Sequence, residues 1–130
     1  MNLFDINQQD QELIDRAFDV VNQNFDNVKF NHTVGAAVRC RDGGVFLGVN
    51  CDGNHGACAE YIAIGAAITA GRRDFDTIVA IYGGDGRILP PCGNCRQMLW
   101  EYSPEIMVIL NTANGIKKAK ISDLLPFAEI

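Results

Sequence analysis

The fold of this chain is decided by two stretches, Cys58-Ala59-Glu60 and Pro91-Cys92-Gly93-Asn94-Cys95. Each is expected where a loop becomes a helix, and the free N–H groups and dipole of a helix N-terminus stabilise a thiolate. Two helices that start side by side would bring Cys58, Cys92 and Cys95 onto one metal ion. Three thiolates fill three positions of a tetrahedral zinc ion and leave the fourth open for water.

The segments around these stretches alternate between helical and extended patterns. Apolar residues at helical spacing predict a first helix over residues 10–24. Strands over 34–40 and 45–49 flank Asp42-Gly43-Gly44, which is typical of a hairpin turn. The remaining elements are expected as helices at 58–70 and 92–102 and as strands at 77–82, 106–110 and 116–121. This order predicts an α/β fold in which helices pack on a mixed sheet, with the apolar strands 77–82 and 106–110 inside it.

The composition sets limits on the class of protein. The 130 residues have no Pro-, Gly- or Ser-rich break, so residues 1–130 are expected to form a single domain. No apolar run reaches the roughly 18 residues that a membrane-spanning helix needs, and no secretory leader pattern begins the chain. We therefore expect a cytoplasmic protein without a membrane partner. The net charge of −5 and the scattered basic residues argue against nucleic-acid binding and favour a small-molecule substrate.

Three other roles for the cysteines compete with a catalytic metal site. A structural zinc usually has a fourth protein ligand, and the candidates are Cys40, Cys51, His32 and His55. A redox Cys-x-x-Cys would leave Cys58-Ala59-Glu60 unexplained. The cysteines could also be small buried apolar residues. The Cys-Ala-Glu stretch, together with Arg96-Gln97 after the second pair, favours the catalytic zinc site.

Glu60 and Arg96 are the residues expected to serve this site. Two positions after a ligand, Glu60 can lean toward the open zinc position and move protons. Zinc lowers the pKa of a bound water to about 7, an effect that three thiolates weaken. Arg96 follows Cys95 and is expected to donate hydrogen bonds to the sulfurs. Asn50 and Asp52, in the loop before the ligand helix, are either turn residues or partners of a sugar hydroxyl.

With these residues in place, the chain resembles the small cytidine deaminases over nearly its whole length. The motifs that carry the resemblance are Val34-Gly35-Ala36-Ala37, Gly48-Val49-Asn50, Cys58-Ala59-Glu60 and Pro91 to Gln97. Within that family it is most similar to the blasticidin S deaminases. The stretches that carry this second resemblance are Gly56 to Glu60, Ile78 to Ile81, Ile88 to Gln97 and Leu124-Leu125-Pro126.

The resemblance implies a three-layer α-β-α sandwich with a mixed five-stranded sheet, a homotetramer and one zinc ion per subunit. It implies hydrolytic loss of ammonia from C4 of a cytosine ring. The residues that it assigns are Cys58, Cys92 and Cys95 as zinc ligands, Glu60 as proton shuttle, Ala59 and Pro90 as ring contacts, and Asn50 and Asp52 as ribose contacts.

The chain also departs from the family pattern. Tyr61 follows the catalytic Glu where many tetrameric cytidine deaminases have Arg, and the loop between Asn50 and Cys58 is shorter. The aromatic residue that stacks on the base aligns with His32, so that Phe30 or a neighbouring subunit is expected to take over its role.

Two substrates and one non-enzymatic role follow from this pattern. The first substrate is a cytosine nucleoside, cytidine or 2′-deoxycytidine, because Asp52 can accept a hydrogen bond from a ribose hydroxyl. The alternative is blasticidin S or a similar cytosine-bearing antibiotic. A catalytically silent zinc-binding protein would require a fourth protein ligand on the zinc. Editing of RNA or DNA is disfavoured by the acidic charge, and Cys40 and Cys51 carry no assigned role.

Overall fold

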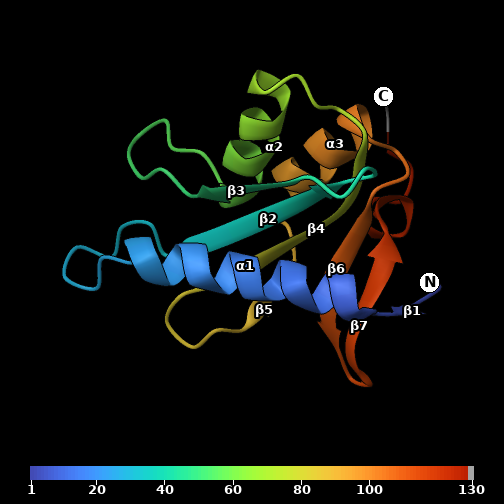
Figure 1. Ribbon diagram of the computed structural model, residues 1–130, viewed down its shortest axis with the longest axis horizontal. Helices are drawn as coiled ribbons and strands as arrows, with labels where there is room; N and C mark the ends of the chain where they lie inside the picture. Colours follow the sequence, from blue (N-terminus) through green and yellow to red (C-terminus); the bar gives the residue numbers. More distant parts are fainter. Residues whose placement is uncertain (129–130) are drawn as a thin grey trace.

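The computed structural model describes residues 1–128, in which helices cover both faces of one sheet (Figure 1). The helices are α1 (Gln8–Asn24), α2 (Ala59–Thr69) and α3 (Gly93–Tyr102), with a 3₁₀ turn, η1, at Ile121–Leu124. The strands are β1 (Phe4–Asp5), β2 (Val34–Cys40), β3 (Val45–Val49), β4 (Phe75–Tyr82), β5 (Ile88–Leu89), β6 (Met107–Thr112) and β7 (Gly115–Lys120). The predicted α/β class is confirmed.

The sheet has seven strands within residues 1–128, so the expected number of five is wrong. Its order is β1-β7-β6-β4-β2-β3, and β5 pairs with β4 beside this path. The five longer strands are those expected, while β1 and β5 have two residues each, too few to form an alternating pattern. β4 and β6 lie in the interior of the sheet, as predicted, and the structure shows that they pair in parallel.

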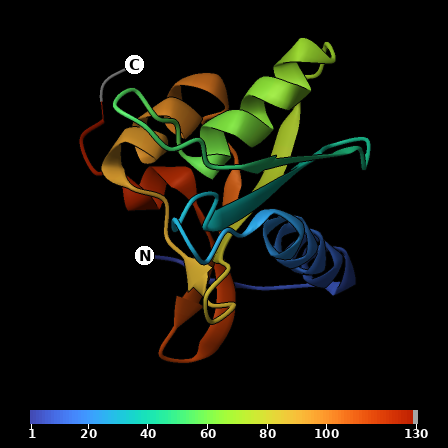
Figure 2. The same cartoon turned by 90° about the vertical axis from the view of Figure 1, so that its left-hand side faces the viewer.

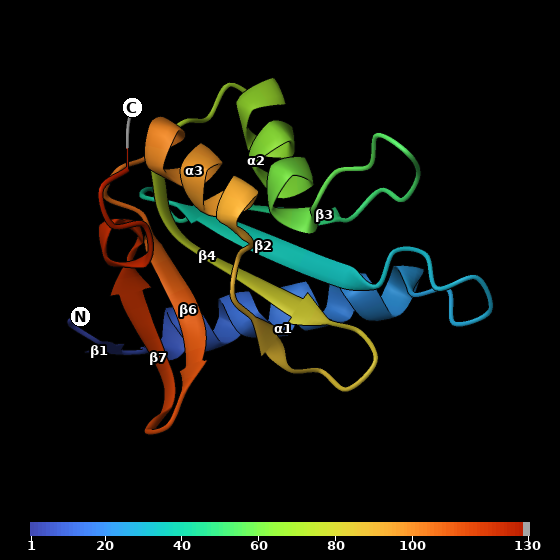
Figure 3. The same cartoon turned by 180° about the vertical axis from the view of Figure 1, so that it is seen from behind.

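Two apolar cores separate the three layers, which Figure 2 shows edge-on. Alternate residues of β2 point to opposite faces of the sheet, as they must in an extended strand. Ala36 and Val38 pack in the core beneath α2 and α3, and Ala37 packs in the core beneath α1. α2 and α3 therefore share one face, seen from the front in Figure 3.

Gly48 on β3 fixes how closely α2 approaches the sheet. A Cβ atom at this position would lie 2.5 Å from the backbone nitrogen of Ala63 and 2.9 Å from the carbonyl oxygen of Ala59. Both atoms belong to the helix backbone, which cannot move aside as a flexible side chain does. Because Gly48 has no side chain, the first turn of α2 can pack directly against β3.

Gly48→Ala is expected to lower the free energy of unfolding by about 2 kcal/mol, within the range for overpacked sites. Chemical denaturation measures this loss, and metal analysis shows whether the shift of α2 disturbs the residues at its start. Gly44→Ala is the matched control, because its Cβ would meet only the tips of Arg72 and Asp42. Equal denaturation midpoints for the two variants would contradict the packing argument.

None of the helices within residues 1–128 is long and apolar enough to cross a membrane.

Candidate metal centre and substrate cavity

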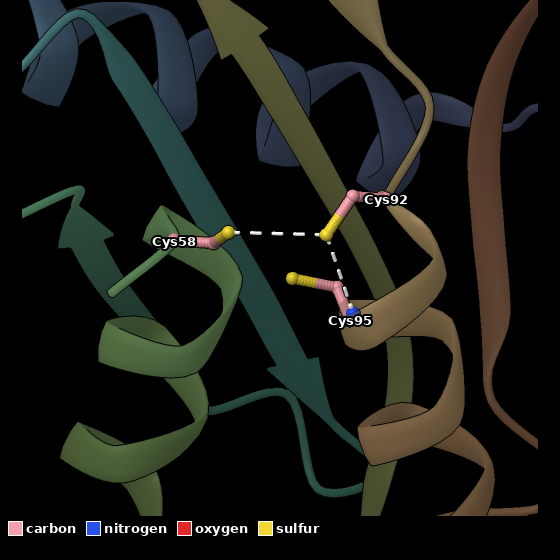
Figure 4. A group of neighbouring side chains, drawn as sticks. All are labelled: Cys58, Cys92 and Cys95. Carbon is pink, nitrogen blue, oxygen red and sulfur yellow. Dashed lines mark hydrogen bonds between the residues drawn. The ribbon is translucent and has the colours of Figure 1, made fainter. Parts of the chain in front are cut away.

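Three cysteine sulfurs meet between the starts of α2 and α3 (Figure 4). Cys58 is the residue that precedes α2, Cys92 precedes α3, and Cys95 lies in the first turn of α3. All three sulfurs lie within 4.8 Å of one another, and those of Cys58 and Cys92 are 3.9 Å apart. Tetrahedral bonds of about 2.3 Å to one zinc ion would place sulfurs about 3.8 Å apart. The donor set therefore fits zinc, and zinc is the cofactor of this site.

Cys58, Cys92 and Cys95 form the metal group, which offers three sulfurs to an ion that takes four ligands in tetrahedral geometry. Among the side chains of residues 1–128, none of the four candidates for a fourth ligand joins the cluster. These candidates were Cys40, Cys51, His32 and His55. No disulfide occupies the cysteines, which are all free. A site with three protein ligands is the catalytic rather than the structural type.

The pKa values of the three cysteine thiols are not all shifted in the same direction. Burial raises the pKa of the Cys58 and Cys95 thiols, and the neighbouring charged groups add to this for Cys95. Burial also acts to raise the pKa of Cys92, but hydrogen bonds outweigh it and lower this pKa overall. The backbone N–H of Cys95 donates to the Cys92 sulfur over 3.4 Å. The fold thus favours the thiolate form of Cys92 more than that of Cys58 or Cys95.

Glu60 lies in the first turn of α2, two residues after Cys58. Its side chain is buried, with 6% of the residue exposed, and burial raises the pKa of its carboxyl group. It lines the same cavity as Cys58 and Cys92. A carboxyl group that is desolvated in this way can hold a proton more readily than an exposed one.

One cavity of about 390 Å³ lies over this group. Its walls contain most of the residues that the sequence assigned to the site, namely Cys58, Cys92, Glu60, Ala59, Pro90, Asn50 and Asp52. Cys95 is buried beneath the cavity with 0% exposure. Cys51, which the sequence offered only as a possible fourth metal ligand, also lines the cavity because it lies between Asn50 and Asp52. His32 and Phe30 are not among the lining residues.

Asn50 and Asp52 are linked to each other, to the first residue of β2 and to the segment just before it. The side-chain nitrogen of Asn50 donates to Asp52 Oδ1 over 3.3 Å, and Asn50 Oδ1 accepts from the backbone N–H of Val34 over 3.0 Å. Asp52 Oδ2 accepts from the backbone N–H of His32 over 2.8 Å. Both polar groups are therefore held in place at the cavity wall.

Arg96 does not make the contacts expected for it. Its Nε donates to the carbonyl oxygen of Pro91 over 2.8 Å, and its Nη1 donates to that of Leu124 over 3.1 Å. These bonds tie the loop before Cys92 to the 3₁₀ turn η1, and they serve backbone oxygens instead of sulfurs. Tyr61 makes a second link near the metal group, since its hydroxyl donates to Asn94 Oδ1 over 3.4 Å.

Comparison with known proteins agrees with this geometry. Residues 7–111 match the model of the cytidine and deoxycytidylate deaminase zinc-binding region. The chain is 36% identical over 136 residues to a blasticidin-S deaminase of Bacillus cereus, covering 97% of this chain and 96% of that protein. It is 39% identical over 100 residues to a cytidine deaminase of Halalkalibacterium halodurans, covering 73% and 75%. A crystal structure of cytidine deaminase from Burkholderia pseudomallei superposes with a TM-score of 0.74 at 30% identity, covering 95% of this chain and all of that one.

Proposed function

This chain belongs to the cytidine and deoxycytidylate deaminase family, and from that premise we propose that it deaminates a free cytosine nucleoside, cytidine or 2′-deoxycytidine. It is a zinc-dependent hydrolase that acts on a C–N bond. One observation supports the nucleoside best: a single cavity is lined by metal ligands and Glu60, and also by Asn50 and Asp52. The metal ligands and Glu60 suit the reaction at the ring amine, whereas Asn50 and Asp52 suit hydrogen bonding to a sugar.

The reaction replaces the 4-amino group of the ring by oxygen. Zinc, when bound, lowers the pKa of a water molecule to about 7 and so supplies a nucleophile near neutral pH. Glu60 takes up the two protons that this water gives up in turn, passing the first to ring N3 and the second to the leaving amine. A C4–O bond forms, the C4–N bond breaks, and ammonia leaves. The buried carboxyl of Glu60 suits a group that must both accept and release protons.

The ring and the sugar would be held by different walls of the cavity. The backbone of Ala59 and the carbonyl of Pro90 are the proposed ring contacts, and both residues line the cavity. Asn50 and Asp52 are the proposed ribose contacts. Each Asp52 oxygen accepts one described hydrogen bond, and a carboxylate has about four acceptor sites, so capacity remains for hydroxyl donors.

Blasticidin S is the second candidate substrate. The match to the Bacillus cereus blasticidin-S deaminase extends over 97% of this chain, whereas the match to the Halalkalibacterium halodurans cytidine deaminase extends over 73%. Ammonia release and the ultraviolet shift should be followed with cytidine, 2′-deoxycytidine and blasticidin S side by side. Turnover of the nucleosides would support the proposal. Turnover of blasticidin S alone would replace the proposal with deamination of this antibiotic. No turnover of the three compounds would reject both the nucleosides and blasticidin S.

Asp52→Ala should raise the KM for cytidine about 10-fold, the order expected for a hydrogen bond to a charged group. The KM for free cytosine, which has no ribose, should stay unchanged and serves as the internal control. Steady-state kinetics on both substrates measure the difference. Equal effects on the two KM values would reduce Asp52 to a residue of the loop.

We also propose that the protein is a homotetramer, for which the composition of α2 gives physical support. Glu60 is the one charged residue in this helix, yet Ile62 and Gly65 are half-exposed and Ala66 is exposed. A helix that is apolar on all sides is normally buried, so this face of α2 is suited to packing against other subunits. Light scattering should give four chain masses, and a single chain mass would reject the assembly.

A single catalytic domain over residues 1–130, a cytoplasmic location and a role in pyrimidine salvage remain predictions of the sequence.

A further inference from the structure

His32 lies outside the cavity but contacts both residues that are proposed to hold the sugar. Its ring Nδ1 is 2.9 Å from the carbonyl oxygen of Asn50, and its backbone N–H donates to Asp52 Oδ2. A carbonyl oxygen can only accept, so Nδ1 must carry the proton and donate it. The ring therefore binds the loop 50–57 and does not bind a base in the cavity.

The backbone at His32 is held in an unusual conformation. Its φ angle is +55°, in the left-handed region that few residues other than glycine adopt, although Asn, Asp and His tolerate it best. Such a conformation persists where the surrounding contacts fix it. Here the same residue makes two hydrogen bonds to the opposite loop, one from its backbone and one from its ring. The strained turn therefore aims both donors at Asn50 and Asp52.

We infer that His32 is a positioning residue that sets substrate specificity. It binds the backbone carbonyl of Asn50 and the carboxylate of Asp52, and so holds the side chains of both residues as a preformed site for the ribose. This inference rests on the proposed function, because it gives His32 a role in the same nucleoside site. The ring acts through the loop and touches no reacting atom.

Two variants of the zinc-loaded protein separate the effect of the hydrogen-bond donor from the effect of the imidazole ring. His32→Ala removes the donor, whereas His32→Asn keeps a donor nitrogen at the same bond distance from the backbone and tolerates the left-handed conformation. His32→Ala should raise the KM for cytidine about 10-fold with kcat within about twofold, and the KM for free cytosine should not change. His32→Asn should restore the KM for cytidine to within about threefold of wild type. A fall in kcat alone, or equal KM effects on cytidine and cytosine, would overturn the inference.

A second readout needs no turnover. Hydrogen exchange in the loop 50–57 reports on its order, including the paired backbone of Cys51 and Ala57. Exchange should be about 10-fold faster in His32→Ala and near wild type in His32→Asn. Phe30→Ala is the matched control for exchange, since Phe30 has the same φ of +55° and lies in the same loop before β2. Unchanged exchange in His32→Ala would reject the role of His32, whereas failure of the wild type to deaminate cytidine would reject the proposed function.

Discussion

Replacing Glu60 with Gln is expected to lower kcat by about 1,000-fold or more, while zinc content and stability stay at wild-type values. Gln has nearly the same size and shape as Glu but cannot take up or release a proton in this range. General acid–base catalysis contributes about 10²- to 10⁴-fold, and one carboxyl group moves protons at several steps here. The cavity, with Cys58 and Cys92 in its walls, should keep its shape in this variant.

Three measurements make this test specific. Deamination kinetics give kcat, metal analysis gives zinc per chain, and thermal unfolding reports on the fold. Glu12→Gln is the matched control, since Glu12 is exposed on α1, across the sheet from the metal group. A Glu60→Gln protein that retains one zinc and more than a tenth of the wild-type rate would falsify the proton-shuttle role.

Cys92→Ala is expected to abolish stoichiometric zinc binding and to lower stability strongly. Cys92 supplies one of three sulfurs, and its sulfur also accepts a hydrogen bond from the backbone of Cys95 at the start of α3. Because a metal that binds only the folded chain adds its binding energy to folding, loss of the ion lowers the unfolding temperature. The missing cap adds about 1 kcal/mol to this loss.

A chelator separates the two parts of the effect. Wild type stripped of zinc should fall nearly to the stability of Cys92→Ala, with only the difference due to the cap remaining. Cys51→Ala is the control: its cysteine also lines the cavity but stands outside the three-sulfur group, so one zinc per chain should remain. One zinc per chain in Cys92→Ala would show that the ligand set is wrong.

The strands that the sequence predicted are those whose side chains alternate or are apolar throughout. β2 and β3 match their expected bounds, and β4 begins at Phe75, two residues earlier than expected, because Phe75 pairs with Cys40. β1 and β5 could not be predicted from local pattern. β1 forms only by pairing with Lys117 and Lys118, far along the chain, and each of the two strands has two residues.

The site also contains features that the sequence could predict and contacts that it could not. The three sulfurs and Glu60 were predictable because their chemistry depends on which side chains occur at which spacing. The partners of Arg96 were not, since Pro91 and Leu124 accept through backbone carbonyls that every residue possesses. The contact of His32 with the Asn50 carbonyl was hidden for the same reason. Residue type tells little about which carbonyl a donor will reach.

The position of β4 between the ligand helices has a consequence for how each molecule is made. Cys58 is translated before β4, Cys92 after it, and β6, the parallel neighbour of β4, later still. Until the ribosome has released β6, the strand that joins the two helices lacks one of its lateral partners. A nascent chain that ends near Cys95 has all three sulfurs but lacks the completed sheet that holds them together. The sheet on which both ligand helices pack can therefore be completed only after β6 has been translated.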